Sequence, residues 1–381
     1  MTTADGKGPV LVRLTAGLAV RDPAQAKQYQ FVCSARWIAP RSPLLTGMPE
    51  GQGYIASEDG FYRVDVAGKV TKLAVAGVDP LAVRAIGSAA GEPLALVVSK
   101  GAARAHAIGR PAVGGASPTV WTGSGEWYGA RSSADAMWIA QSGGAVVRVV
   151  GVRGDGTHSD ELVAVDSSTA TASVAWVAPN AQKLYLSLIG KATQRIVEVD
   201  RSAPASGPRS AKVLFQDYPF VAGPVPVAGK SLAVVTGVLV DVATHPPGQV
   251  DDSRWYTCLD SALRADGGVS AFACSKGAVY AIDAAGKPAA LVFALDHLTA
   301  PDYAGLDDIG RYACWAEWSD FARDSGLDPG PEPAGVVPPV GTDGCTAGRS
   351  GPDRCAALWP CAGLAVAALV SLRRRRTAAL R

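Results

Sequence analysis

Asparagine and histidine are nearly missing from this chain of 381 residues. Asn180 is the only asparagine, and the four histidines stand at positions with no common spacing: His106, His158, His245 and His297. Because a transition-metal centre needs several such ligands at short, defined intervals, the histidines predict no metal site. Charged residues are also scarce, at 18% of the chain, but hydrophobic residues reach 48%, which excludes a disordered or fibrous protein.

The body of the chain has no excess of positive charge. Five arginines lie at the extreme C-terminus, no acidic residue follows Asp353, and the formal net charge of the whole chain is only +2. The residues before this terminal cluster therefore carry a small net negative charge. A mildly acidic body without a basic stripe argues against nucleic acid as a partner.

Glycine, in contrast, is abundant, with 43 residues, and six of the glycines recur at a regular interval. Each follows a short apolar run, and successive members are 40 to 47 residues apart. The six are Gly60, Gly101, Gly144, Gly190, Gly237 and Gly277. A strand–turn–strand unit that recurs every ~40–50 residues is typical of a β-propeller, because one four-stranded blade cannot bury its own faces alone.

We therefore expect an all-β fold, with a β-propeller over residues 25–312. The six turn glycines favour six blades, and seven arise if strands before residue 28 pair with the chain after residue 300 to close the ring. Residues 1–24 are set apart as an N-terminal segment, because their apolar stretch is interrupted by Arg13 and lacks the cleavage site of a signal peptide. Either the true start lies upstream, or Val10–Leu14 forms an outer strand.

None of the seven cysteines forms a Cys-x-x-Cys pair. Three of them lie near the C-terminus: Cys345, Cys355 and Cys361. The four in the body allow three pairings. We expect Cys258 to pair with Cys274, because both fall in neighbouring strands of the last repeat, and Cys33 then joins Cys314. The alternative is buried, reduced thiols in a cytosolic protein, since disulfides are a feature of oxidising compartments.

The sequence changes character after the last repeat. Residues 313–326 have apolar side chains at a 3.6-residue period, which predicts a short amphipathic helix that ends near Gly326. We expect Trp315 and Trp318 to pack this helix onto the propeller, with stacking on carbohydrate as the alternative role. Residues 327–354 are rich in Pro and Gly and have no periodicity, so they predict a linker.

Residues 355–381 predict a transmembrane tail. Cys355 to Leu372 is a run of 18 residues without a charge. As a helix it would measure ~27 Å at ~1.5 Å per residue, just enough to cross the hydrocarbon core of a bilayer. Arginines beside a span stay in the cytoplasm, so this orientation puts the propeller outside. The alternative, a buried core helix, does not suit a run that ends in an arginine cluster.

A Gly-Cys step, a short apolar span and a terminal arginine run occur here in that order. The residues are Gly344, Cys345, Arg373, Arg374, Arg375 and Arg376. Together they resemble the MYXO-CTERM sorting tail of myxobacterial surface proteins. The resemblance covers about residues 344–376 and implies processing near Cys345, with the mature protein left at the cell surface. This chain differs in its extra cysteines, Cys355 and Cys361, and in a longer gap before the span.

The chain shows no constellation of catalytic or cofactor-binding residues. Hydrolytic propellers of the lactonase and gluconolactonase kind bind a metal through Glu, Asp and Asn side chains. This chain has a single Asn and no Glu that recurs at equivalent blade positions. The acidic pairs Asp251-Asp252 and Asp307-Asp308 fall in expected loops and leave a calcium site open, but neither has the alternating spacing of a calcium loop.

We therefore predict a non-enzymatic propeller of the cell surface or envelope, exported and anchored in the membrane by its C-terminal helix, that binds a protein or a glycan. The first alternative is a metal-dependent extracytoplasmic hydrolase of the lactonase or gluconolactonase type. The second is an assembly scaffold within the envelope.

Overall fold

The computed structural model divides the chain into two units, Met1–Pro333 and Ala334–Arg381. It describes residues 11–14, 17–22, 28–36, 44–47, 52–57, 59–65, 69–99, 101–109, 118–166, 169–178, 181–190, 194–216, 220–244, 246–263 and 269–333. The predicted span and every residue of the sorting tail lie outside these ranges, as does most of the predicted linker. No helix within these ranges is long and apolar enough to cross a membrane.

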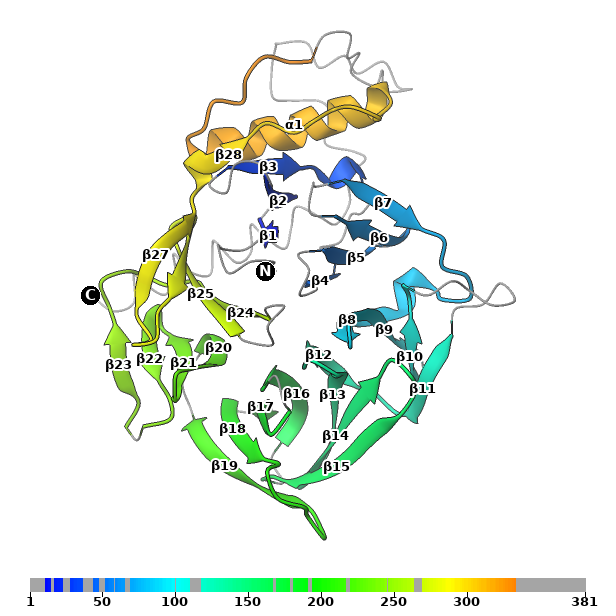
Figure 1. Ribbon diagram of the computed structural model, residues 1–381, viewed down its shortest axis with the longest axis vertical. Coiled ribbons are helices and arrows are strands. Elements are labelled where there is room, and N and C mark those ends of the chain that lie inside the picture. The colour runs from blue at the N-terminus through cyan, green and yellow to red at the C-terminus, as the bar shows by residue number, and fades with distance from the viewer. Residues whose placement is uncertain are drawn as a thin grey trace, which may run out of the picture. The chain divides into compact units, whose positions relative to one another are not determined.

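Strands dominate the first unit, and their sheets follow one another around a ring (Figure 1). Six groups are antiparallel meanders of four consecutive strands, each with its first strand innermost in the ring (Figure 1). The first three are β4 (Leu44–Gly47), β5 (Gly53–Ser57), β6 (Gly60–Val64) and β7 (Val70–Leu73); β8 (Val83–Ala89), β9 (Glu92–Ser99), β10 (Ala102–Ala107) and β11 (Thr119–Ser124); and β12 (Tyr128–Ser132), β13 (Ala136–Gly143), β14 (Val146–Arg153) and β15 (His158–Ala164).

The next three are β16 (Thr169–Val177), β17 (Lys183–Gly190), β18 (Gln194–Asp200) and β19 (Arg209–Gln216); β20 (Phe220–Val227), β21 (Lys230–Val235), β22 (Val238–Asp241) and β23 (Gly248–Asp251); and β24 (Cys258–Leu263), β25 (Val269–Ser275), β26 (Ala278–Ile282) and β27 (Pro288–Phe293). The propeller-like arrangement follows from the sequence pattern, because single blades bury their faces only against their neighbours in the ring.

The six recurring glycines all lie at the turn between the second and third strands of a group. Two of these turns have positive φ at both central residues, with Thr236 at 46° before Gly237 at 83°, and Lys276 at 48° before Gly277 at 76°. Turns of this kind match the right-handed twist of the flanking strands, which is why glycine is needed there. The sequence period therefore reports a real structural repeat.

A seventh four-stranded group closes the ring, with strands from both ends of the unit. β1 (Leu11–Arg13), β2 (Leu18–Arg21) and β3 (Tyr29–Val32) come first in the chain, and β28 (Leu298–Thr299) pairs in parallel with β3. The count of six favoured by the glycines is thus one too low, and the seven-bladed alternative describes the ring. β1 is the innermost strand of this group and not an outer one (Figure 1).

The third and fourth groups are joined into one eight-stranded sheet by a short parallel contact between β15 and β19. Beside this contact, Glu161 accepts hydrogen bonds from Arg201 and Arg209 at 2.7 and 2.6 Å. The Arg201 guanidinium also lies 4.3 Å from the ring centroid of Trp138. Burial would raise the pKa of Glu161, but the two guanidinium groups lower it below its usual value. Glu161 is therefore ionised and ties the outer strands of two groups together.

One helix, α1 (Asp308–Ser325), covers the outside of the closing group (Figure 1). It begins five residues earlier than the sequence predicts, because Asp307 caps it by accepting a hydrogen bond from the Gly310 amide at 2.7 Å. It ends as expected at Gly326, which has a φ of 74°. The buried face of α1 places Trp318 against Phe31 of β3, with 5.2 Å between their ring centroids.

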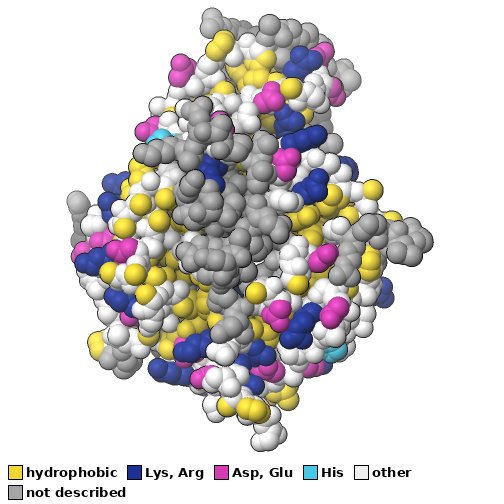
Figure 2. Space-filling view, in the orientation of Figure 1, with side chains coloured by type: hydrophobic (Ala, Val, Ile, Leu, Met, Phe, Trp, Pro, Cys, Tyr) yellow, Lys and Arg dark blue, Asp and Glu magenta, His cyan; other side chains and the backbone are white. Residues whose placement is uncertain are grey.

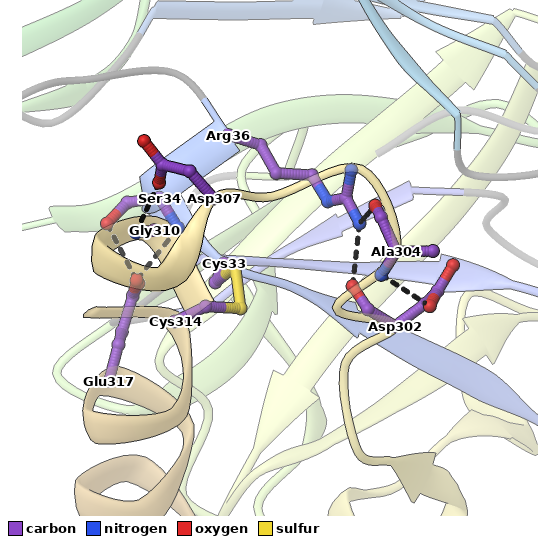
Figure 3. Close-up of a disulfide and its surroundings, with 9 residues drawn as sticks. All are labelled: Cys33, Ser34, Arg36, Asp302, Ala304, Asp307, Gly310, Cys314 and Glu317. Carbon is purple, nitrogen blue, oxygen red and sulfur yellow. Dashed lines mark hydrogen bonds between the residues drawn. A yellow bond between two sulfur atoms is a disulfide. The ribbon is translucent and has the colours of Figure 1, made fainter. Parts of the chain in front are cut away.

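A disulfide joins Cys33, just after β3, to Cys314 in α1, with an S–S distance of 2.01 Å (Figure 3). Next to it, the amide and hydroxyl of Ser34 both donate to Glu317 of α1, at 2.8 and 2.7 Å (Figure 3). Arg36 donates to the carbonyl oxygens of Asp302 and Ala304. We call this set of contacts, between residues 33–36 and residues 302–317, the closure seam.

Both expected disulfides are present, since Cys258 and Cys274 are also joined.

The closure seam predicts a pH-dependent stability. Burial raises the pKa of Glu317 above its ordinary value of 4.5, although the hydrogen bonds from Ser34 lower it in part. As the pH rises from about 4.5, the unfolded chain ionises Glu317 before the folded chain does, so the folded state loses stability over that interval. Glu317→Gln should remove this loss and flatten the fall in the unfolding midpoint between pH 4.5 and 7.

The matched control is Asp320→Asn, since Asp320 lies on the same helix with its side chain 74% exposed. Guanidinium unfolding of the three proteins across this pH range measures the effect. If Glu317→Gln follows the same pH curve as the wild type, the carboxyl group is not the source of the dependence.

Candidate binding face

The turns between second and third strands and the connections between successive groups lie on the same face of the ring. Antiparallel strands reverse direction at each turn, so the turn between the second and third strands lies at the same end as the connection from the fourth strand to the next group. The contacts agree: Gly237 lies against Trp255 of the β23–β24 connection, and Gly277 against Leu295 after β27. We call this surface the glycine-turn face.

Half of the large exposed hydrophobic side chains in the described residues belong to the glycine-turn face. They are Leu81, Tyr128, Ile189 and Trp255. The remainder lie on outermost strands or on α1: Leu162, Val213, Leu291 and Ile309. Trp255 is the most prominent of the four, at 63% exposure, and it is the only exposed member of the seven tryptophans that the structure describes.

The loop that carries Trp255, residues 252–257, is fixed at both ends. At its start, Asp251 accepts hydrogen bonds from the hydroxyl groups of Tyr256 and Ser253. At its end, the Tyr256 amide donates to the Gly237 carbonyl at 2.8 Å and the Thr257 amide donates to the Cys274 carbonyl at 2.9 Å. The Tyr256 side chain is fully buried. The loop is therefore held in one conformation by its own polar contacts.

The second disulfide strengthens this attachment. Cys258 follows the loop directly and stands opposite Cys274 in the register of β24 and β25. The bond between them has a Cα–Cα distance of 4.9 Å. It thus joins the C-terminal end of the loop to the strand that leads into the Gly277 turn.

The indole of Trp255 lies flat against Gly237. A Cβ atom built on Gly237 would lie 2.4 to 2.7 Å from Cδ2, Cε2 and Cε3, the atoms at the centre of the indole. One face of the indole therefore rests on the glycine backbone, and its 63% exposure must come from the opposite face and the edges. Only glycine leaves room for this contact.

Substitution of Gly237 tests this packing. We expect Gly237→Ala to lower the free energy of unfolding by about 2–3 kcal/mol, because it adds a displaced indole to the strain of a left-handed residue. Gly229→Ala is the matched control, since Gly229 has a φ of 85° in the turn between β20 and β21 and nothing within 4 Å of the added Cβ. It should cost about 1 kcal/mol, from backbone strain alone. If denaturant titrations give both variants the same loss of unfolding free energy, the packing of the Trp255 indole does not depend on Gly237.

The charged groups around Trp255 include both signs. Burial would raise the pKa of Asp251, but hydrogen bonds from Tyr256 and Ser253 lower it below 3.8, so this carboxylate is ionised near neutral pH. The Arg254 guanidinium lies 4.5 Å from the ring centroid of Tyr280. Acidic and basic side chains are likewise mixed over the face drawn in Figure 2. The surroundings of Trp255 are therefore polar, with both signs of charge present.

Three of the four acidic residues considered as calcium ligands make structural contacts. Asp251 holds the Trp255 loop, Asp307 caps α1, and Asp308 forms an ion pair with Arg311 at 3.1 Å. Within the described ranges, no group of three or more His, Cys, Asp or Glu side chains is arranged to hold a metal ion.

No pattern in the sequence singles out Trp255. The only local signal is that this tryptophan directly follows the polar stretch Asp252-Ser253-Arg254. The carbohydrate alternative raised for Trp318 is wrong, because Trp318 is 2% exposed and packs in the core. The sorting-tail residues Gly344 and Cys345 lie outside the described residues.

The ring of four-stranded groups, closed by strands from both ends, defines the first unit as a β-propeller. No protein-family model matches the chain, and no curated protein matches it. Solved structures resemble it at low identity. A nidogen–laminin complex chain is 12% identical over 64% of this chain and 94% of its own, with a TM-score of 0.38.

Two lyases give similar values. Virginiamycin B lyase from Staphylococcus aureus is 12% identical over 64% of this chain and 82% of its own, with a TM-score of 0.39. A streptogramin B lyase is 12% identical over 66% of this chain and 83% of its own, also with a TM-score of 0.39. The function must therefore be argued from the residues of this chain.

Proposed function

We propose that this protein is a non-enzymatic binding module of the cell surface or envelope, whose glycine-turn face docks a protein or a glycan. The observation that carries the proposal is the exposed indole of Trp255, held on that face by a fixed loop. Tryptophan is enriched at binding surfaces because its ring is apolar and its N–H can donate a hydrogen bond.

Two disulfides support the exported location. One links residues 281 positions apart, and the other links adjacent strands. Disulfides form and persist in oxidising compartments and are rare in the cytosol. The sorting-tail resemblance of residues 344–376 points the same way, with the C-terminal helix as the membrane anchor.

Fractionation of cells that express a tagged full-length chain tests the location. We expect the protein in the envelope or at the surface, with its four body cysteines unavailable to thiol reagents until it is reduced. A soluble, cytosolic protein with reactive thiols would end the proposal. Metal analysis of the purified chain addresses the hydrolase alternative, which requires a stoichiometric divalent ion.

A further inference from the structure

We infer that Trp255 is a stacking platform for an uncharged hexopyranose of an oligosaccharide, with the polar side chains of residues 252–257 around it. This inference rests on the proposed binding function and names the ligand of the same face. It begins with the geometry of the indole, which has one face against Gly237 and the other open. A flat, open aromatic face is the surface that the C–H groups of a sugar ring contact.

The neighbours of Trp255 favour a sugar over a protein. Four other side chains of the loop are exposed, and all of them are polar: Asp252, Ser253, Arg254 and Thr257. The buried core of a protein–protein interface is instead depleted in charged residues. The other exposed hydrophobic residues of the glycine-turn face belong to different groups of the ring, so they do not extend the Trp255 platform.

The same side chains supply hydrogen bonds of both kinds. Asp252 accepts, Arg254 donates and the Thr257 hydroxyl can do either, while the Ser253 hydroxyl, which donates to Asp251, can still accept. Such a mixed set suits the hydroxyl groups at the rim of a pyranose ring. Because acidic and basic groups are both present, the loop does not select a charged sugar, and the ligand class is a neutral one.

The platform is also preorganised. Hydrogen bonds to the Gly237 and Cys274 carbonyls, the buried Tyr256 and the adjacent disulfide keep the loop in place before any ligand arrives. Fixing a binding surface in advance removes the entropy cost of ordering it, which matters most for shallow sites with few contacts.

The test uses the full-length chain with three neutral probes, cellohexaose, maltohexaose and chitohexaose. Isothermal titration and saturation-transfer NMR should detect binding of at least one of them. Trp255→Ala should weaken that binding by about tenfold or more, since it removes the whole stacking surface. Leu291→Ala is the control, because Leu291 is exposed on the outermost strand β27, and it should leave the affinity unchanged.

A second pair of variants covers the case in which Trp255→Ala misfolds. Gly237→Ala should weaken binding by displacing the indole, whereas Gly229→Ala, with the same kind of turn and no contact, should not. Failure of all three oligosaccharides to bind overturns the inference, as does binding that Trp255→Ala leaves intact. If a protein partner is lost specifically in Trp255→Ala while no sugar binds, the sugar inference fails but the binding function stands.

Discussion

Replacing Cys33 and Cys314 by serine should lower the free energy of unfolding by roughly 5 kcal/mol. The bond joins residues 281 positions apart, so without it the unfolded chain regains the entropy of a very long open loop. The effect should be larger than for most single disulfides, because loop entropy grows with loop length. The closure seam would keep only the hydrogen bonds of Ser34 and Arg36.

The matched control is the double replacement of Cys258 and Cys274, which are only 16 positions apart. The same relation gives a loss of roughly 3 kcal/mol for this shorter loop. Guanidinium unfolding of both variants, with thiol titration to verify the remaining bond, measures the difference. A loss from the short loop that equals or exceeds that from the long one would show that the closing disulfide does little to restrain the unfolded chain.

The second large effect is expected at Trp318. Trp318→Ala should lower the free energy of unfolding by about 3–5 kcal/mol, the range for removing a fully buried aromatic side chain. The indole is 2% exposed, contacts Phe31 and Phe321, and donates a hydrogen bond to the Pro329 carbonyl at 2.9 Å. Its loss would leave a cavity between α1 and β3 that the rigid ring of sheets cannot fill.

Trp315 on the same helix provides the comparison. It is only partly buried, and its Nε1 is a buried donor without a partner among the described residues. Trp315→Ala removes this unsatisfied group together with the packing, and the two changes offset each other. We expect the free energy of unfolding to fall by about 1 kcal/mol or less, and the shift in the thermal unfolding midpoint measures it. Comparable shifts for the two variants would contradict the placement of Trp318 as the anchor of α1.

The repeat was predictable because it is set by local backbone chemistry. A tight turn between paired strands needs positive φ, and glycine supplies it wherever asparagine is scarce, as Gly237 and Gly277 show. The pairing of Cys258 with Cys274 follows from the same local unit, since two strands joined by a short connection bring these residues directly opposite each other.

The seventh group was harder to predict because no local rule defines it. β28 has only two residues, and it pairs in parallel with a strand almost the whole unit away in sequence. The start of α1 was also hard to predict. The helix begins at Asp308 because Asp307 caps it, but its first turn contains Gly310 and the exposed Ile309, so the 3.6-residue apolar period does not extend to that end.

Trp255 could not be recognised as a site residue from its own surroundings in the sequence. What makes it a platform is the contact with Gly237, a residue in a different hairpin, and the support of a buried tyrosine. Both are tertiary features. The sequence showed the glycine as a turn residue, but the space above its Cα atom becomes visible only in the fold.

The way β28 completes its sheet has a consequence for biogenesis. During synthesis, β3 has no outer neighbour until the chain has reached Leu298 and Thr299 of β28. Until then its unpaired backbone groups are available to any other strand, including those of sister chains. Until translation has passed residue 299, the nascent chain therefore presents one unpaired sheet edge, which is a site for aggregation or for binding by a chaperone.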